Sequence, residues 1–174
     1  MVASLDGFIA KEDGDISWMH TNDSYENGKT LTEDDITKFL EGIDCYLMGS
    51  KTYEHAVQLG WVYGDTPVVV LTNRALESYR ASVSFRAGGL EKLVNEELKP
   101  KYDSIWAVGG ASLTRDLLQL KLVDEIVLTL TPVLLGDGTL FFNHVGVEQP
   151  LHLKDVTAFD DGMVELTYEV NKDQ

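Results

Sequence analysis

Hydrophobic residues recur at two spacings along this chain, and each spacing predicts one kind of element. Apolar residues three or four positions apart, as at Ile36, Phe39, Leu40 and Ile43, are typical of an amphipathic helix. Acidic residues after Thr32 and a proline at position 100 supply start and stop signals for two such helices. Helices are therefore expected over residues 33–43, 50–59, 90–98 and 111–120.

Continuous apolar runs and alternating segments predict the strands. Buried strands are expected over residues 44–48, 67–71, 104–108 and 125–135, and short strands over 83–85 and within 5–16. Two alternating segments, 151–159 and 163–170, flank Asp160-Asp161-Gly162, which is a β-hairpin signal. Strands that alternate with helices and end in antiparallel strands predict an α/β fold, with a central mixed sheet and helices on both faces.

Size and composition narrow the class of protein. A chain of 174 residues is expected to form a single domain, here residues 1–174. Its only cysteine is Cys45, so an intrachain disulfide is excluded. Because Cys45 lies in an apolar run, a buried, reduced thiol is predicted. No apolar run approaches the roughly 18 residues of a membrane helix, and the N-terminus lacks the features of a secretion signal. We therefore expect a cytoplasmic protein with no membrane partner.

Charge and motif content exclude several functions. The net charge of −15 disfavours a nucleic-acid partner, because a phosphate backbone needs clustered lysine and arginine. A small phosphorylated ligand needs only a few cations, and Lys51, Arg74, Arg80 and Arg86 are candidates. The four histidines lack metal-ligand spacing and no nucleophile motif of a hydrolase occurs, so neither a metal site nor hydrolase chemistry is predicted.

The most informative segment is the apolar run that ends at Val108 and meets Gly109-Gly110 before a predicted helix. Glycines remove the Cβ that would keep a phosphate away, and the first N–H groups of a helix point at such an anion. The predicted pyrophosphate cradle consists of Gly109, Gly110, Ala111, Ser112 and Leu113, with Val108 before it. A tight junction between strand and helix is the alternative explanation.

This segment, followed by the motif from Leu122 to Phe141, resembles the reductase domain of bifunctional riboflavin-biosynthesis deaminase-reductases, a branch of the dihydrofolate reductase superfamily. The resemblance covers nearly the whole chain. It implies a dihydrofolate-reductase-like three-layer fold, NADPH as cofactor, and a small heterocyclic substrate. We expect none of these 174 residues to correspond to the zinc-binding deaminase half of those proteins.

Two further segments resemble cofactor-binding elements of the superfamily. Gly49, Ser50, Lys51 and Thr52 resemble a Gly-Arg-x-Thr element at a helix N-terminus that faces the cofactor. Here Ser50 replaces the arginine and Lys51 carries the charge one position later, which weakens the expected preference for NADPH over NADH. Leu71, Thr72, Asn73 and Arg74 resemble the segment that borders the adenosine, and Arg74 is of the type that pairs with a 2′-phosphate. A helix start with an exposed lysine and a solvated loop arginine are the alternatives.

The opening motif, Ser4 to Ala10, resembles one whose aspartate lies in the substrate pocket of riboflavin-type reductases. The resemblance makes Asp6 the candidate catalytic residue, which binds substrate donor groups or assists protonation. A simple turn at Asp6-Gly7 is the alternative. Those reductases usually carry a glutamate before the glycine pair, where this chain has Val108, and this departure disfavours the riboflavin substrate.

Together these motifs predict an NADPH-dependent reductase that passes a hydride to a C=N or C=O carbon of a pterin-like or pyrimidine-like substrate. The alternative is a nucleotide-binding protein of the same fold without turnover. The apolar run over residues 125–135 and the family resemblance further predict a two-fold homodimer, with residues 130–142 near the interface.

Overall fold

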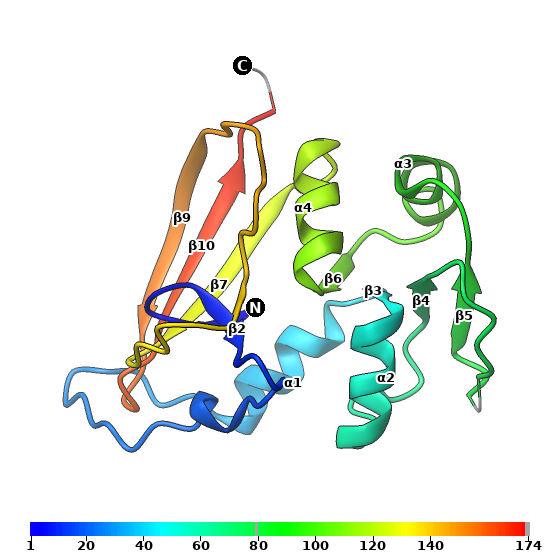
Figure 1. The fold of residues 1–174 in the computed structure, drawn as a ribbon. Coiled ribbons are helices and arrows are strands. Elements are labelled where there is room, and N and C mark those ends of the chain that lie inside the picture. The colour runs from blue at the N-terminus through cyan, green and yellow to red at the C-terminus, as the bar shows by residue number, and fades with distance from the viewer. Residues whose placement is uncertain (79, 173–174) are drawn as a thin grey trace. The chain divides into compact units, whose positions relative to one another are not determined.

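The computed structural model describes residues 1–78 and 80–172. It contains two compact units: residues 34–122 form the central unit, and residues 1–33 with 123–174 form the terminal unit. Figure 1 colours the elements of both units in chain order. The prediction of a single domain over residues 1–174 stays a prediction.

The central unit is built on a four-stranded parallel sheet in the order β5-β4-β3-β6. Its strands are β3 (Cys45–Gly49), β4 (Val68–Leu71), β5 (Val83–Arg86) and β6 (Ile105–Gly109). Parallel neighbours need crossover connections. Helix α2 (Ser50–Leu59) follows β3, helix α3 (Leu90–Lys92) with the π-helical segment η2 (Leu93–Leu98) follows β5, and helix α4 (Ala111–Gln119) follows β6.

Helices cover both faces of this sheet, because side chains of successive strand residues point to opposite sides. On one face Tyr46, Met48, Val68 and Val70 are buried in a core that includes Tyr53 of α2. Alternate residues of the same strands are also buried, and α4 packs against β6. Figure 1 shows α2 below the sheet and α4 above it, which is the expected layering. Helix α1 (Glu33–Glu41) precedes β3.

The terminal unit contains a four-stranded mixed sheet in the order β1-β7-β10-β9. These strands are β1 (Val2–Ser4), β7 (Glu125–Thr131), β9 (Leu151–Ala158) and β10 (Val164–Val170). Strand β1 runs parallel to β7, whereas β10 is antiparallel to β7 and to β9. A short antiparallel ribbon pairs β2 (Phe8–Ala10) with β8 (Thr139–Leu140), and η1 (Ser17–Met19) is a 3-10 turn.

The predicted elements are present, and the differences concern one strand end, one helix and two short strands. Strand β7 ends at Thr131, because Pro132 has no N–H to donate to a ladder. The helix over residues 90–98 changes to π-helical hydrogen bonding at Leu93. Strands β1 and β8 were not predicted, since two or three residues are too few to show a period. The C-terminal hairpin and the α/β class are confirmed.

Candidate functional site

Three of the predicted segments converge at one edge of the parallel sheet. Strands β3, β4 and β6 all run in the same direction, so their carboxyl ends lie at the same edge. Gly49 pairs with Leu71, and Met48 pairs with Gly109. The segments 49–52, 71–74 and 108–113 therefore leave the sheet side by side. In open α/β sheets this edge is where ligands bind.

Two helices begin at this edge with free backbone donors. Gly49 is the N-cap of α2 and Gly110 is the N-cap of α4, and neither helix start has a side-chain cap. The first N–H groups of a helix have no partner within it, and the helix dipole adds positive potential there. An added Cβ on Gly49 would meet nothing within 4 Å, so the space in front of α2 is open. The arrangement can bind two anionic groups.

The backbone before α4 permits close approach. The pairing of β3 with β6 steps by one residue between Leu47–Ala107 and Met48–Gly109, so Val108 forms a β-bulge. Gly109 and Gly110 follow with φ of 104° and 88°, where residues with a Cβ are disfavoured. The Thr52 hydroxyl donates to the Gly109 carbonyl at 3.2 Å, which ties α2 to this turn. Both glycines are thus required by the backbone.

The charged side chains at the edge differ in how far they are neutralised. The Arg74 guanidinium donates to both oxygens of Glu54, over 2.8 Å and 2.7 Å, so this candidate phosphate partner is already paired. Lys51 is exposed and forms no ion pair within residues 1–78 and 80–172. Of the two cations Lys51 and Arg74, Lys51 is therefore the one whose charge is not compensated by a carboxylate of the described residues.

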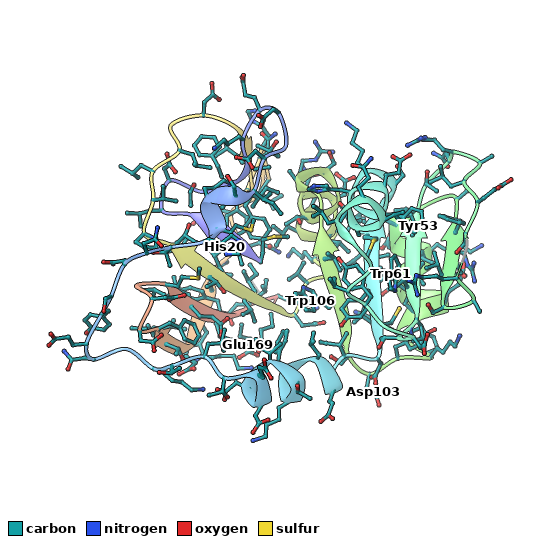
Figure 2. The ribbon with its side chains drawn as sticks, turned by 90° about the horizontal axis from the view of Figure 1, so that it is seen from below. His20, Tyr53, Trp61, Asp103, Trp106 and Glu169 are labelled. Carbon is teal, nitrogen blue, oxygen red and sulfur yellow. The ribbon has the colours of Figure 1, made fainter. Side chains whose placement is uncertain are left out.

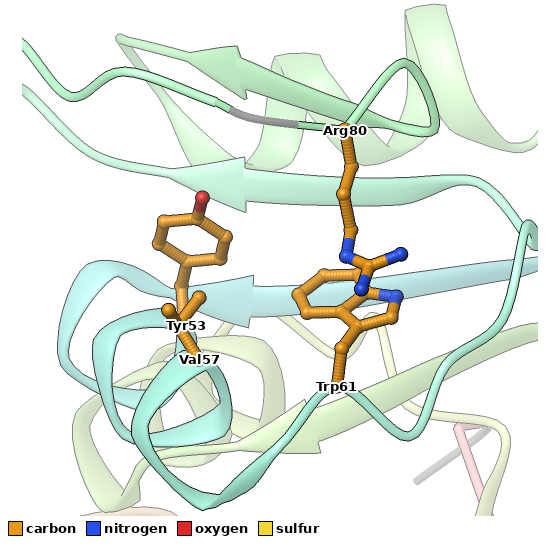
Figure 3. A pocket seen from close by; sticks show the side chains of 4 residues that line it. All are labelled: Tyr53, Val57, Trp61 and Arg80. Carbon is orange, nitrogen blue, oxygen red and sulfur yellow. The ribbon is translucent and has the colours of Figure 1, made fainter.

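The two other candidate cations are also engaged. Arg86 pairs with Glu97 at 2.9 Å, and the Arg80 guanidinium lies 5.2 Å from the centroid of the Trp61 ring. Arg80, Trp61, Tyr53 and Val57 line a cavity of about 230 Å³ along α2 (Figure 3). Trp61 follows the C-terminal end of α2, so this cavity extends away from the carboxyl edge.

A second glycine pair was missed by the sequence analysis. Gly88 and Gly89 follow β5, and Gly89 is the N-cap of α3 without a side-chain cap. Gly88 has a φ of 112°, and a Cβ on either glycine would meet no atom within 4 Å. The Thr72 N–H donates to the Arg86 carbonyl at 2.8 Å, which places the end of β5 beside that of β4. The sequence signal for this pair is the same strand–Gly-Gly–helix pattern that was recognised at residues 109–110.

Aromatic rings fill the face of the sheet beneath α2. Trp106 of β6 contacts Tyr46 with ring centroids 5.7 Å apart, and Phe39 of α1 meets Trp106 edge-on at 5.1 Å. Tyr53 and Trp61 lie near each other in the same unit, with centroids 6.1 Å apart (Figure 2). Val108 packs against this cluster, so it contributes to the core of the central unit.

Asp6 of the terminal unit holds a turn and a loop together. It lies in the turn closed by the Gly7 N–H on the Ser4 carbonyl. Its carboxylate accepts hydrogen bonds from the Ser4 hydroxyl at 2.6 Å and from the N–H groups of Leu135 and Gly136 at 3.1 and 2.8 Å. These donors, that of Ser4 first, lower the pKa of Asp6 below its ordinary value. Asp6 is thus an ionised acceptor at neutral pH, and its substrate role stays a prediction.

Metal, membrane and thiol chemistry have no support within residues 1–78 and 80–172. No group of three or more His, Cys, Asp or Glu side chains among these residues is arranged to hold a metal. None of the helices they form is long and apolar enough to cross a membrane. Cys45 is buried, as predicted, and burial raises the pKa of its thiol to about 11, which makes it a poor nucleophile.

Comparison with known families identifies the chain's own family. The sequence profile of the RibD C-terminal domain matches residues 1–164. The chain belongs to this family. One sequence relative is the uncharacterized protein YwjB of Bacillus subtilis (strain 168), which is 32% identical over 170 residues, or 97% of this chain and 94% of YwjB.

Solved structures of RibD-type proteins have the same fold. A putative riboflavin biosynthesis protein from Shewanella sp. PV-4 superposes with a TM-score of 0.84 at 24% identity, covering 99% of this chain and 97% of that one. A deaminase/5-amino-6-(5-phosphoribosylamino)uracil reductase from Thermotoga maritima gives 0.68 at 17% identity, covering 98% of this chain and 55% of that one. The predicted dihydrofolate-reductase-like fold of the RibD C-terminal type is confirmed.

Proposed function

We propose that this RibD C-terminal domain protein is an NADPH-dependent reductase of a small heterocyclic substrate. The observation that carries the proposal is the convergence of three strand ends at one sheet edge, where α2 and α4 begin with glycine N-caps and uncapped N–H groups. This edge suits an elongated ligand with two phosphate-bearing parts. A net charge of −15 is compatible with such a ligand, because the donors are local backbone groups.

The residues present fit a dinucleotide. Gly109 and Gly110 leave room for a pyrophosphate, which the N–H groups of Ala111, Ser112 and Leu113 would bind. The N–H groups of Ser50, Lys51 and Thr52 at the start of α2 would bind a second phosphate, with Lys51 as its cation. Thr72, Asn73 and Arg74 leave β4 at the same edge and would border the adenosine ribose.

The reduced nicotinamide would supply the hydride, and the chain's residues would orient the substrate and exclude water. Asp6 suits the binding of N–H groups on a pterin or pyrimidine ring, since its carboxylate is held ionised. For the same reason it does not suit the role of proton donor at neutral pH. We therefore assign the proton to water, and Asp6 to substrate orientation.

A nucleotide-binding protein without turnover is the second candidate. It is favoured by Val108, an apolar residue in the position where riboflavin-type reductases carry glutamate, and by the three hydrogen bonds that already occupy Asp6. These features disfavour the ribosylamino-pyrimidine substrate more than they disfavour cofactor binding. For the reductase proposal, dihydropterins are therefore the first substrate class to test.

The deciding experiment measures binding and turnover separately. Dissociation constants for NADPH and NADH would be obtained by calorimetry, and NADPH oxidation would be followed with dihydrofolate, other dihydropterins and amino-pyrimidines. Micromolar NADPH binding with turnover of one substrate class supports the reductase. Binding without turnover on any of them supports the second candidate, and absence of NADPH binding overturns both.

We also propose a two-fold homodimer with residues 130–142 near its interface. Support comes from large apolar side chains of this segment that stay exposed, among them Leu134 at 69% and Phe142 at 43%. Contiguous exposed apolar residues are typical of protein interfaces.

A cytoplasmic location stays a prediction from the sequence.

A further inference from the structure

The pair formed by Glu54 and Arg74 is the feature of the carboxyl edge that the proposed function does not use. Glu54 is the fifth residue of α2, and Arg74 lies three positions beyond the end of β4. Two parallel hydrogen bonds join them, from Nη1 to Oε2 at 2.8 Å and from Nη2 to Oε1 at 2.7 Å. Such a fork-to-fork pair satisfies the same guanidinium N–H groups that a phosphate would take.

The pairing has electrostatic consequences for both side chains. Arg74 lowers the pKa of the Glu54 carboxyl, and Glu54 raises the pKa of the Arg74 guanidinium. The Arg74 side chain is 57% exposed and the Glu54 side chain 38% exposed, so solvent screens the pair and a ligand group can replace one partner. A ligand phosphate must displace Glu54 to take these two N–H groups, and at the other guanidinium N–H groups of Arg74 it faces the Glu54 carboxylate as a nearby like charge.

The same carboxylate suits a different ligand group. An acidic side chain accepts hydrogen bonds from ribose hydroxyls, whereas an arginine favours a 2′-phosphate at that place. Residues 51 and 54 lie three positions apart on α2, so their side chains share one face of the helix. Lys51, Glu54 and Arg74 therefore present one uncompensated positive charge, which would become two if Glu54 were neutral.

We propose that Glu54 sets the cofactor choice of this edge, by holding Arg74 and thereby reducing the preference for a 2′-phosphorylated dinucleotide over one with a free 2′-hydroxyl. This inference rests on the proposed function, because it assumes that the adenosine end of a dinucleotide lies beside Arg74. It adds a residue that tunes specificity without contact with the reacting atoms.

The test uses fragments that isolate the 2′-phosphate. Calorimetry would measure 2′,5′-ADP, 5′-AMP, NADPH and NADH on the full chain, wild type against Glu54→Gln. We expect the variant to bind 2′,5′-ADP and NADPH about 3- to 10-fold more tightly, as removal of one nearby charge predicts, with 5′-AMP and NADH unchanged or weaker. The gain should shrink as salt rises. In the Arg74→Gln background, the same substitution should give a much smaller gain.

A matched control separates this effect from a change in net charge. Glu125 of the terminal unit is also an exposed carboxylate paired with a cation, Lys154. Glu125→Gln makes the same charge change and should leave all four affinities unaltered.

The possible failures are distinguishable. If wild type binds both fragments and Glu54→Gln leaves the ratio of their affinities unchanged, the role of Glu54 is overturned and the proposed cofactor site stands. An equal gain in Glu125→Gln also overturns it, since the effect would be one of total charge. If neither the fragments nor the dinucleotides bind wild type, the proposed function and this inference fail together.

Discussion

Replacement of Gly110 by alanine tests whether the turn before α4 is a ligand cradle or only a junction. Gly110 has φ 88° and ψ 129°, and Gly60, at the C-terminal end of α2, has nearly the same backbone with φ 94° and ψ 131°. Alanine at either position therefore meets the same backbone strain. The two sites differ in location, because ten helical residues, about 15 Å, separate Gly60 from the carboxyl edge.

The cost to stability follows from the backbone. A non-glycine residue in such a sparsely populated region costs roughly 1–3 kcal/mol. For a chain of this size that corresponds to a fall in Tm of roughly 2–12 °C. Folded proteins have about 5–15 kcal/mol to lose, so both variants should remain folded. At Gly110 the new Cβ also lies 3.2 Å from Thr52 Oγ1, whereas at Gly60 it meets nothing within 4 Å.

Binding should separate the two variants. In the proposed site, a methyl group at the N-cap of α4 would stand where a phosphate would approach, and displacement of Thr52 would disturb its hydrogen bond to the Gly109 carbonyl. We expect Gly110→Ala to weaken NADPH binding at least about tenfold, or about 1.4 kcal/mol, and Gly60→Ala to leave it unchanged. Calorimetry and thermal melts measure both quantities. Equal affinities in the two folded variants would refute the cradle and support a purely structural glycine pair.

Three other outcomes are expected. Asp6→Asn should lower the thermal stability most at neutral pH, because the lowered pKa of Asp6 means that its ionised carboxylate stabilises the fold. The difference in Tm from wild type should shrink as pH falls below about 4. A difference in Tm that does not change with pH would contradict this. Lys51→Gln should weaken NADPH more than NADH, with a loss that falls as salt rises, whereas equal losses would show that Lys51 does not sense the 2′-phosphate. In sedimentation at micromolar concentration, the wild-type protein should have a mass above the 19.4 kDa of the monomer, and Leu134→Glu should have the monomer mass. The control Val62→Glu makes the same kind of change at a 74%-exposed side chain of the central unit and should keep the wild-type mass. A monomeric wild type would reject the dimer.

Several local features could be read from the sequence because their causes are local. The bounds of α2, Ser50–Leu59, agree with the predicted helix, since apolar spacing and a flanking glycine act within a few residues. The hairpin of β9 and β10 follows from alternation on each side of Asp160-Asp161-Gly162. The strand end and glycine pair of segment 108–113 were recognised for the same reason, whereas segments 49–52 and 71–74 became site candidates through their resemblance to cofactor-binding elements of the superfamily.

Other features were decided only when distant segments met. The pairing of β1 with β7 joins residues more than 120 positions apart, and the bulge at Val108 depends on how β6 aligns with β3. The bond from the Leu135 N–H to Asp6 and the capture of Arg74 by Glu54 are of the same kind. No periodicity encodes which carboxylate a given arginine will find, since that depends on the crossing of α2 over the end of β4. The sequence by itself thus determined the elements and the chemistry each could offer, whereas the tertiary structure decided which of those groups are already satisfied by one another.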